Sequence, residues 1–177
     1  MEPVRYVPHY TVDDYRNWSG DWELIEGVAV AMSPSPSWRH QRVSFLLAKE
    51  IELLLSGCPC KVCLEVDWIV DFNTVVRPDV LVVCDKVEDY VKRAPEVIFE
   101  VVSKSTAFRD ENVKFRLYER EKVKYYGLVY PEFRKVRLFE LRDGKFEKVF
   151  EGEEGEFRLE LEKCSFRLEF GKLWREL

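Results

Sequence analysis

The sequence predicts a mixed α/β (α+β) domain in which a central mixed sheet is flanked by helices and followed by extra C-terminal β-hairpins. Three observations predict it. Two β-branched, apolar runs, Arg77–Val83 and Glu96–Ser105, are typical of buried strands. Segments that follow Ser37 and Thr106 repeat apolar residues at helical spacing. Asp143-Gly144 separates two further strand-like runs, as in a tight hairpin.

The N-terminal quarter predicts a helix, two strands and a long helix. Thr11–Trp18 opens with a threonine followed three residues later by an acid, which is a capping box. Trp22–Met32 reads as two short strands joined at Glu26-Gly27. Ser37–Gly57 has a serine cap, a terminating glycine and one apolar face. That face consists of Val43, Leu46, Leu47, Ile51, Leu54 and Leu55.

The middle of the chain is dominated by strand patterns. Lys61–Val70 and Thr74–Val83 are predicted strands joined by a polar turn around Asn73. Lys86–Lys92 is expected to form one or two helical turns, and Pro95–Val102 another strand. The chain therefore reaches its second long helix directly from a buried strand.

The second half continues with that helix and then with strands. Thr106 caps the helix, whose inner face includes Val113 and Leu117, and Val123–Val129 is a strand. The unit from Glu96 to Val129 should thus contain a parallel crossover. The remaining expected elements are the hairpin Arg134–Leu141 with Lys145–Phe150, the strands Phe157–Leu161 and Phe166–Phe170, and a closing helix at Lys172–Leu177.

Length and composition predict one folded domain spanning residues 1–177, large enough for a substantial core. Charged residues make up 34%, as on the surface of a thermophile protein. The net charge of −5 excludes a protein that is a basic nucleic-acid clamp as a whole, so any such contact must use a local patch or a bound metal. Because neither a signal-peptide core nor an apolar run of membrane-spanning length is present, we expect a cytoplasmic chain with no membrane partner.

The five cysteines leave three interpretations open. Cys58, Cys60 and Cys63 are clustered, whereas Cys84 and Cys164 stand apart. Zinc is disfavoured because no second cysteine pair has matching spacing. A disulfide would be unusual in a cytosol outside hyperthermophiles. Buried or free thiols are the expected state.

Two acids stand out because each interrupts an apolar strand. Asp79 lies in the run RPDVLVV and Glu100 in EVIFEVVSKS. A buried carboxylate is costly unless compensated, and two on neighbouring strands would repel each other. A divalent cation between them resolves both problems, and Mg²⁺ or Mn²⁺ prefers oxygen ligands. The pair therefore indicates metal-dependent chemistry on phosphate.

Several motifs, in order, resemble those of one protein family. They are WELIEG (Trp22–Gly27), MSPSPSWRHQR (Met32–Arg42), RPDVLVVCD, FEVVSKST (Phe99–Thr106), the helical set Asp110, Lys114 and Tyr118, and the strand Tyr125–Tyr130. Together they resemble the PD-(D/E)XK nuclease superfamily and, more narrowly, its bacterial Uma-two branch. The resemblance implies a restriction-endonuclease-like core.

The resemblance also implies roles for individual residues. Asp79 and Glu100 would be catalytic and would bind Mg²⁺ (or Mn²⁺), with Glu23 as a further metal ligand. The superfamily's usual lysine position, two residues after the second acid, is Val102 here. Lys114 on the helix would take over that catalytic role, with Lys104 as a rival.

Further residues would support or bind substrate. Asp110 and Tyr118 flank Lys114 on one side of its helix and would hold it in place. The expected substrate-binding residues are His40, Gln41, Arg77, Ser103 and Lys104. His40 and Gln41 start a helix, whose N-terminus favours phosphate.

Two function hypotheses follow. The first is a metal-dependent nuclease that hydrolyses phosphodiester bonds in DNA, conceivably as a homodimer. The second is a nucleic-acid-binding or protein-interaction module with little or no turnover. A structural role in an oligomer is a weaker third. Ordinary structural roles also remain open, such as a pairing of Asp79 with Arg77 or a solvated Lys114.

Overall fold

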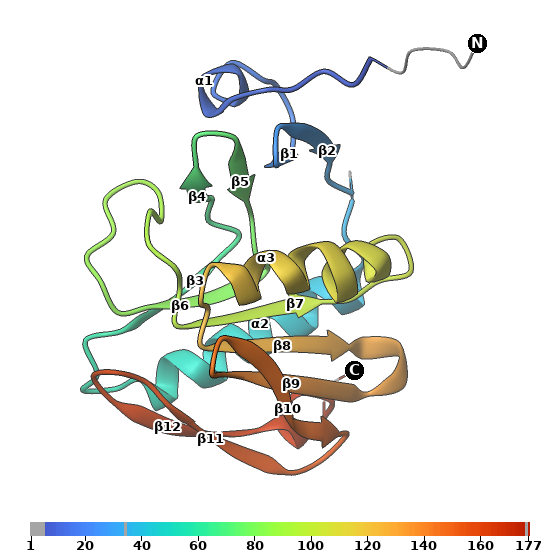
Figure 1. Cartoon of the computed structure of the whole chain (residues 1–177). Helices are drawn as coiled ribbons and strands as arrows, with labels where there is room; N and C mark the ends of the chain where they lie inside the picture. Colours follow the sequence, from blue (N-terminus) through green and yellow to red (C-terminus); the bar gives the residue numbers. More distant parts are fainter. Residues whose placement is uncertain (1–5, 34, 176) are drawn as a thin grey trace.

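A computed structural model describes residues 6–33, 35–175 and 177 of the chain. It contains a four-stranded sheet, a six-stranded sheet and a two-stranded hairpin, ordered β2-β1-β5-β4, β10-β9-β8-β7-β6-β3 and β11-β12. The small sheet lies above the large one in Figure 1, and the C-terminal hairpin lies below it. The predicted mixed sheet with flanking helices is confirmed.

The N-terminal elements form largely as predicted. The helix α1 (Val12–Tyr15) has the capping box between Thr11 and Asp14. β1 (Trp22–Ile25) and β2 (Val28–Ala31) form a hairpin through Glu26-Gly27. α2 (Trp38–Leu54) begins after Ser37, whose hydroxyl accepts the amide hydrogen of His40.

Each of the two predicted long strands in the middle of the chain is in fact two strands. Lys61–Val70 divides into β3 (Lys61–Leu64) and β4 (Trp68–Asp71), and Thr74–Val83 into β5 (Thr74–Val76) and β6 (Val80–Val83). β4 and β5 belong to the small sheet, whereas β3 and β6 belong to the large one. Pro78 lacks an amide hydrogen and so cannot continue the ladder between β5 and β6. The predicted helical turns at Lys86–Lys92 are wrong, since this segment is a loop that bridges Trp68 through Val91.

The second half of the large sheet contains the predicted crossover. β7 (Val97–Val101) pairs in parallel with β8 (Tyr125–Tyr130), and the helical segment lies between them in sequence. That segment is π-helical over Arg109–Lys114 before it becomes α3 (Phe115–Arg120). The sequence did not reveal this π-helical turn.

The C-terminal strands match their predictions, while the closing helix does not. β9 (Lys135–Arg142) and β10 (Lys145–Gly152) flank Asp143-Gly144, both with positive φ. β11 (Glu156–Glu160) and β12 (Ser165–Glu169) form the hairpin. Among the residues described after β12, the regular structure is a 3₁₀ turn, Phe170–Leu173.

Two apolar layers sandwich the large sheet because strand residues alternate between its faces. On one face Val80, Val82 and Phe99 pack against α2 and the C-terminal hairpin. On the other, Leu81 and Ile98 pack against α3. Figure 1 shows α3 in front of the sheet and α2 behind it. Asp79 is two residues from Leu81, and Glu100 is two residues from Ile98, so both acids belong to the α3 face.

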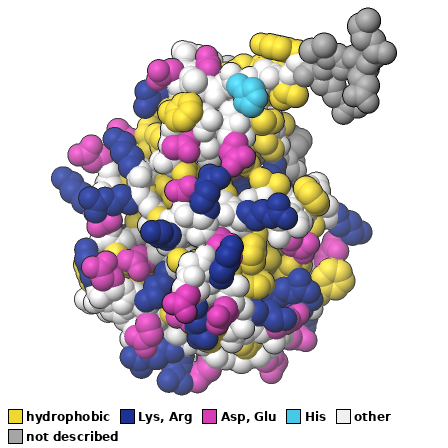
Figure 2. All heavy atoms as spheres, viewed as in Figure 1, with side chains coloured by type: hydrophobic (Ala, Val, Ile, Leu, Met, Phe, Trp, Pro, Cys, Tyr) yellow, Lys and Arg dark blue, Asp and Glu magenta, His cyan; other side chains and the backbone are white. Residues whose placement is uncertain are grey.

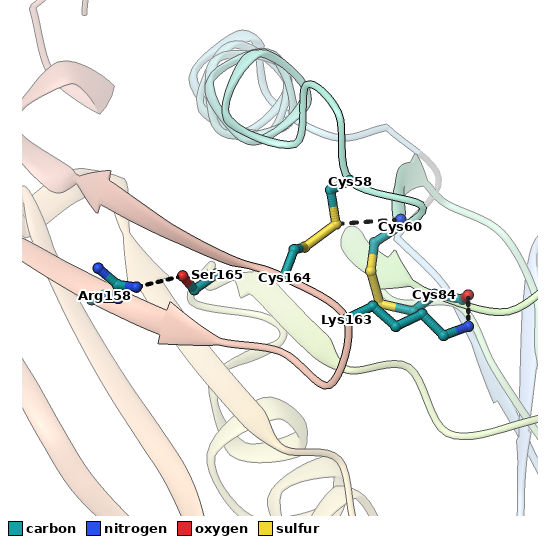
Figure 3. The surroundings of a disulfide bond; sticks show 7 residues. All are labelled: Cys58, Cys60, Cys84, Arg158, Lys163, Cys164 and Ser165. Carbon is teal, nitrogen blue, oxygen red and sulfur yellow. Dashed lines mark hydrogen bonds between the residues drawn. A yellow bond between two sulfur atoms is a disulfide. The ribbon is translucent and has the colours of Figure 1, made fainter.

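Four cysteines meet beside α2 and pair as disulfides. Cys58 is bonded to Cys164, and Cys60 to Cys84 (Figure 3). Cys60 and Cys84 extend the antiparallel register of β3 and β6, and the hairpin turn brings Cys164 to Cys58. The expectation of thiols is therefore wrong for these four. Cys63 is the free cysteine, and burial raises the pKa of its thiol.

No helix among the described residues is long and apolar enough to cross a membrane. This agrees with the absence of a long apolar run in the sequence.

The Cys58–Cys164 bond should stabilise the fold because it closes a separation of 106 residues in the unfolded chain. Cys164→Ser should lower the free energy of unfolding by about 4 kcal/mol. Cys63→Ser is the matched control and should change it little. Denaturant unfolding without reductant measures both, and equal effects of the two variants would contradict the assignment.

Candidate active site

The two acids of the apolar runs are cross-strand neighbours. β6 and β7 are antiparallel with Val80 opposite Phe99, so Asp79 and Glu100 form the next pair and share one face of the sheet. The Asp79 amide lies 3.4 Å from Glu100 Oε2, and the Val101 amide donates to Asp79 Oδ2 at 2.7 Å. The two side chains therefore do not lie on opposite faces of the sheet, an arrangement that would have ruled out a shared metal ion.

A buried lysine joins Glu100 to the small sheet. Lys114 Nζ lies 2.9 Å from Glu100 Oε1 and 2.8 Å from Glu23 Oε1, and all three side chains are buried. The Tyr118 hydroxyl donates to Glu100 Oε1 at 2.7 Å. Because Lys114 and Tyr118 are four residues apart, one face of the helix presents both donors to the same carboxylate oxygen.

Asp79 has a different set of partners. His40 Nε2, from the start of α2, lies 3.4 Å from Asp79 Oδ2. Burial alone would raise the pKa of Asp79, but the bond to His40, the charge of Lys114 and the Val101 amide outweigh it and lower that pKa. Burial would lower the pKa of His40, and Asp79 raises it instead.

Glu100 and Lys114 are shifted in the same direction for different reasons. Burial, with the nearby charges of Asp79, Asp110 and Glu23, raises the pKa of Glu100 despite Lys114. Burial would lower the pKa of Lys114, but Glu100, Glu23 and Asp110 together raise it. At neutral pH the lysine is therefore charged.

These residues surround a cavity of about 180 Å³. Its lining includes the predicted residues His40, Gln41, Arg77, Asp79, Glu100, Asp110 and Lys114. A larger hollow of about 440 Å³ lies within the loop after β6, away from these acids. The chemistry of the side chains, rather than size, makes the smaller cavity the candidate site.

Some predicted residues have other positions. Glu23 does not line the cavity but contacts residues that do, because its Oε1 pairs with Lys114 and accepts the amide hydrogen of Arg77. Ser103 bonds to Thr106, and Lys104 is exposed, so neither lies in the cavity lining. The Arg77 guanidinium is occupied by three side chains, those of Asp67, Asp21 and Tyr15.

Arg109 and Glu65 are among the lining residues that the sequence analysis missed. Arg109 follows the predicted cap, and its Nε is buried without a hydrogen-bond partner, 3.7 Å from Glu23 Oε2. Glu65 follows β3 with φ of 50° and donates its amide hydrogen to the Asp79 carbonyl. The signal for Glu65 was present, since it is an acid within the apolar run KVCLEVDWIV. Arg109 carries no such signal in a helix rich in charge.

The donor set fits a hard cation such as Mg²⁺. Asp79 and Glu100 offer carboxylate oxygens on one cavity wall. Among the described residues, the only set of three or more ligand atoms within 4.8 Å of one another belongs to Cys58, Cys60 and Cys164. Two protein carboxylates with water completing the shell is the usual manner of Mg²⁺ binding, so the absence of a third close acid is compatible with that ion.

Comparisons with known proteins agree with this geometry. The model of the Uma2 family, described as "Putative restriction endonuclease", matches residues 12–167. The chain belongs to the Uma2 family. A crystal structure described as a putative nuclease belonging to DUF820, from Anabaena variabilis, superposes with a TM-score of 0.75 at 15% identity. It covers 93% of this chain and 97% of that one, and thus shows the same fold. A search of curated proteins found no match.

Uma2 membership supports a nuclease-like protein and, generally, the use of divalent metal. The predicted restriction-endonuclease-like fold is confirmed. The family model also spans the helix that carries Lys114 and the β9–β10 hairpin, so the match is not confined to the two acidic strands.

Removal of the Lys114 charge should destabilise the protein. Lys114→Met removes the cation that the two buried acids Glu23 and Glu100 share, a change that typically costs about 3–5 kcal/mol. The loss should shrink toward pH 5 because burial already raises the pKa of Glu100, which can then take up a proton. Thermal unfolding at pH 5 and pH 7 measures this, with exposed Lys104→Met as the control. A loss equal to that of the control would show that the ion pairs contribute nothing.

Asp110 should make stability depend on pH. Burial raises its pKa from 3.8 to about 6, so the folded state binds this proton more tightly than the unfolded state. The resulting stabilisation is complete below about pH 4 and is lost as pH rises through about 6, a change of up to about 3 kcal/mol. Asp110→Asn should flatten that part of the curve. Denaturant titrations between pH 4 and 7 compare the two proteins, and parallel curves would contradict the shift.

Proposed function

We propose that this Uma2 protein is a Mg²⁺- or Mn²⁺-dependent nuclease that hydrolyses phosphodiester bonds in DNA. The observation that supports this most is the cross-strand pair Asp79 and Glu100 beside a buried, charged Lys114 in one cavity. Two carboxylates and a cation are the groups that metal-assisted phosphoryl transfer requires. Membership of the family supports the same reaction class.

Each residue has a defined task in this proposal. Asp79 and Glu100 would hold the metal ion, which lowers the pKa of bound water and neutralises charge on the scissile phosphate. Asp79 suits this because its carboxyl group ionises readily. Glu100 is fixed through Oε1 by Lys114 and Tyr118, so its Oε2 faces Asp79.

The basic side chains of the cavity would act on the phosphate group of the substrate. Lys114 would orient the attacking water or stabilise the developing negative charge, and its two acid partners keep it protonated. Arg109 lines the same cavity with an unpaired Nε donor and would bind a phosphate oxygen. Glu23 would hold Lys114 in place and would not be a direct metal ligand. This differs from the sequence-based prediction because Glu23 Oε1 is occupied by Lys114 and the Arg77 amide.

The test combines metal binding with cleavage. Calorimetry should detect about one equivalent of Mn²⁺, and Asp79→Asn should abolish the binding because it removes a charged ligand. Plasmid, single-stranded DNA and RNA incubated with Mn²⁺ should reveal DNA cleavage that Glu100→Gln abolishes. Absence of Mn²⁺ binding would overturn the proposal. Mn²⁺ binding without cleavage of any substrate would favour the non-catalytic module.

The lysine assignment has its own control. Lys114→Ala should lower cleavage by about 10²–10³, the usual effect of losing one transition-state contact. Lys104→Ala should cleave like the unaltered protein because its side chain is exposed. Circular dichroism at the assay temperature shows whether both variants are folded. The reverse ranking would place the lysine function in the turn after β7.

A further inference from the structure

One face of α2 has two exposed aromatic side chains, with the half-buried Arg42 between them and the exposed Lys49 after them. Trp38, Arg42, Phe45 and Lys49 follow one another at spacings of four, three and four residues, so they form a continuous stripe. Trp38 is 67% exposed and Phe45 51%. The Arg42 guanidinium lies 5.7 Å from the centroid of the Phe45 ring. We call these four residues the α2 stripe.

The charge of this segment is opposite to that of the whole chain. Between Trp38 and Lys49 the helix contains Arg39, Arg42 and Lys49 and no acid, whereas the chain has a net charge of −5. The helix's acids come in its last turns, and Glu50 is paired with Lys172 at 3.3 Å. The α2 stripe is therefore a local cationic region.

The stripe begins at the candidate active site. Gln41 lines the cavity and lies three residues from Trp38 and four from Phe45, so it neighbours both rings on the helix surface. A polymer whose phosphate occupies the cavity could therefore continue along α2. The two rings are separated by about 10 Å along the helix axis, which leaves room for one stacked base at each.

The face of the molecule that carries α3 has side chains of mixed charge. Figure 2, in which α3 faces the reader, shows basic and acidic side chains interspersed over that face. Arg120 there is paired with Glu26 and Glu121, and Lys114 is buried. The basic residues around α3 therefore do not form a patch of one charge. The α2 stripe is the stronger candidate for binding a polyanion.

We propose that the α2 stripe binds an unpaired nucleic-acid strand next to the active site, with bases stacked on Trp38 and Phe45 and phosphates contacting Arg42 and Lys49. Aromatic rings can stack only on bases whose faces are free, so this surface selects single-stranded or locally opened substrates. The proposal specifies the substrate class of the nuclease, and it therefore rests on the proposed nuclease function. The binding itself needs no turnover.

The experiment measures binding without cleavage. Fluorescence anisotropy in EDTA would use a labelled oligothymidine of about twenty nucleotides and a duplex of the same length. The single strand should bind more tightly. Trp38→Ala and Phe45→Ala should each weaken its binding about fivefold to 100-fold, because each loses one stacking platform. Lys49→Gln should lower the dependence of log Kd on log salt by about one unit.

The control is Leu53→Ala, which removes an equally exposed apolar side chain from the acidic end of the same helix and should leave binding unchanged. Unchanged binding by both aromatic variants, or preference for the duplex, would overturn the proposal. Dissociation of a dimer by both aromatic variants in sedimentation would also overturn it and assign the stripe to self-association. Failure of the nuclease itself is distinguishable, because cleavage would then be absent while stacking-dependent binding persists.

Discussion

The buried ammonium group of Lys114 is the interaction on which the rest of the site depends. It lies between Glu23 of the small sheet and Glu100 of the large sheet, and it comes from the crossover helix. Burying one carboxylate without a partner is costly, and this fold buries two. One ammonium group pairs with both and thereby fixes the small sheet, the large sheet and the helix relative to one another. The geometry of the cavity follows from this three-way contact.

The two strand acids are chemically different although they are cross-strand neighbours. The pKa of Asp79 is lowered by His40 and the Val101 amide, whereas the pKa of Glu100 is raised by deeper burial among other acids. Environments that separate the pKa values of paired carboxyl groups are typical of functional sites. A cation bound between them would relieve the repulsion that raises the pKa of Glu100. Metal binding and ionisation of Glu100 are thus expected to favour each other.

The sequence identified this pair because the cost of a buried charge is visible in a single strand. Asp79 and Glu100 stand out within apolar runs, and their pairing then follows from neighbouring strands. Arg109 could not be identified in this way, because its position depends on how a π-helical turn rotates the helix toward the cavity. Glu23 was expected at the metal, but its role depends on a long-range contact with Lys114.

Other errors in the fold have the same origin. Strand propensity extends across Val66, but β3 belongs to the large sheet and β4 to the small one, so tertiary pairing decides where β3 ends. The break between β5 and β6 has a local cause, since it contains Pro78. The disulfides are also non-local, since Cys58 and Cys164 meet only when the C-terminal hairpin packs beside α2. Cys60 and Cys63 have Cys-x-x-Cys spacing, but they pack in different apolar layers of the large sheet, and Cys60 pairs with Cys84 instead.

An acidic chain with a nucleic-acid substrate presents an electrostatic problem that the fold solves by separating its charges. The acids that we propose as metal ligands lie inside the cavity, where Lys114, His40 and the metal would compensate them. Most surface acids are matched by neighbouring basic residues, as Arg142 is by Glu140 and Glu147. The first three turns of α2 contain Arg39, Arg42 and Lys49 and no acid. Net charge therefore says little about the ligand here, because a phosphate responds most to the charges nearest to it and not to the sum over the whole chain.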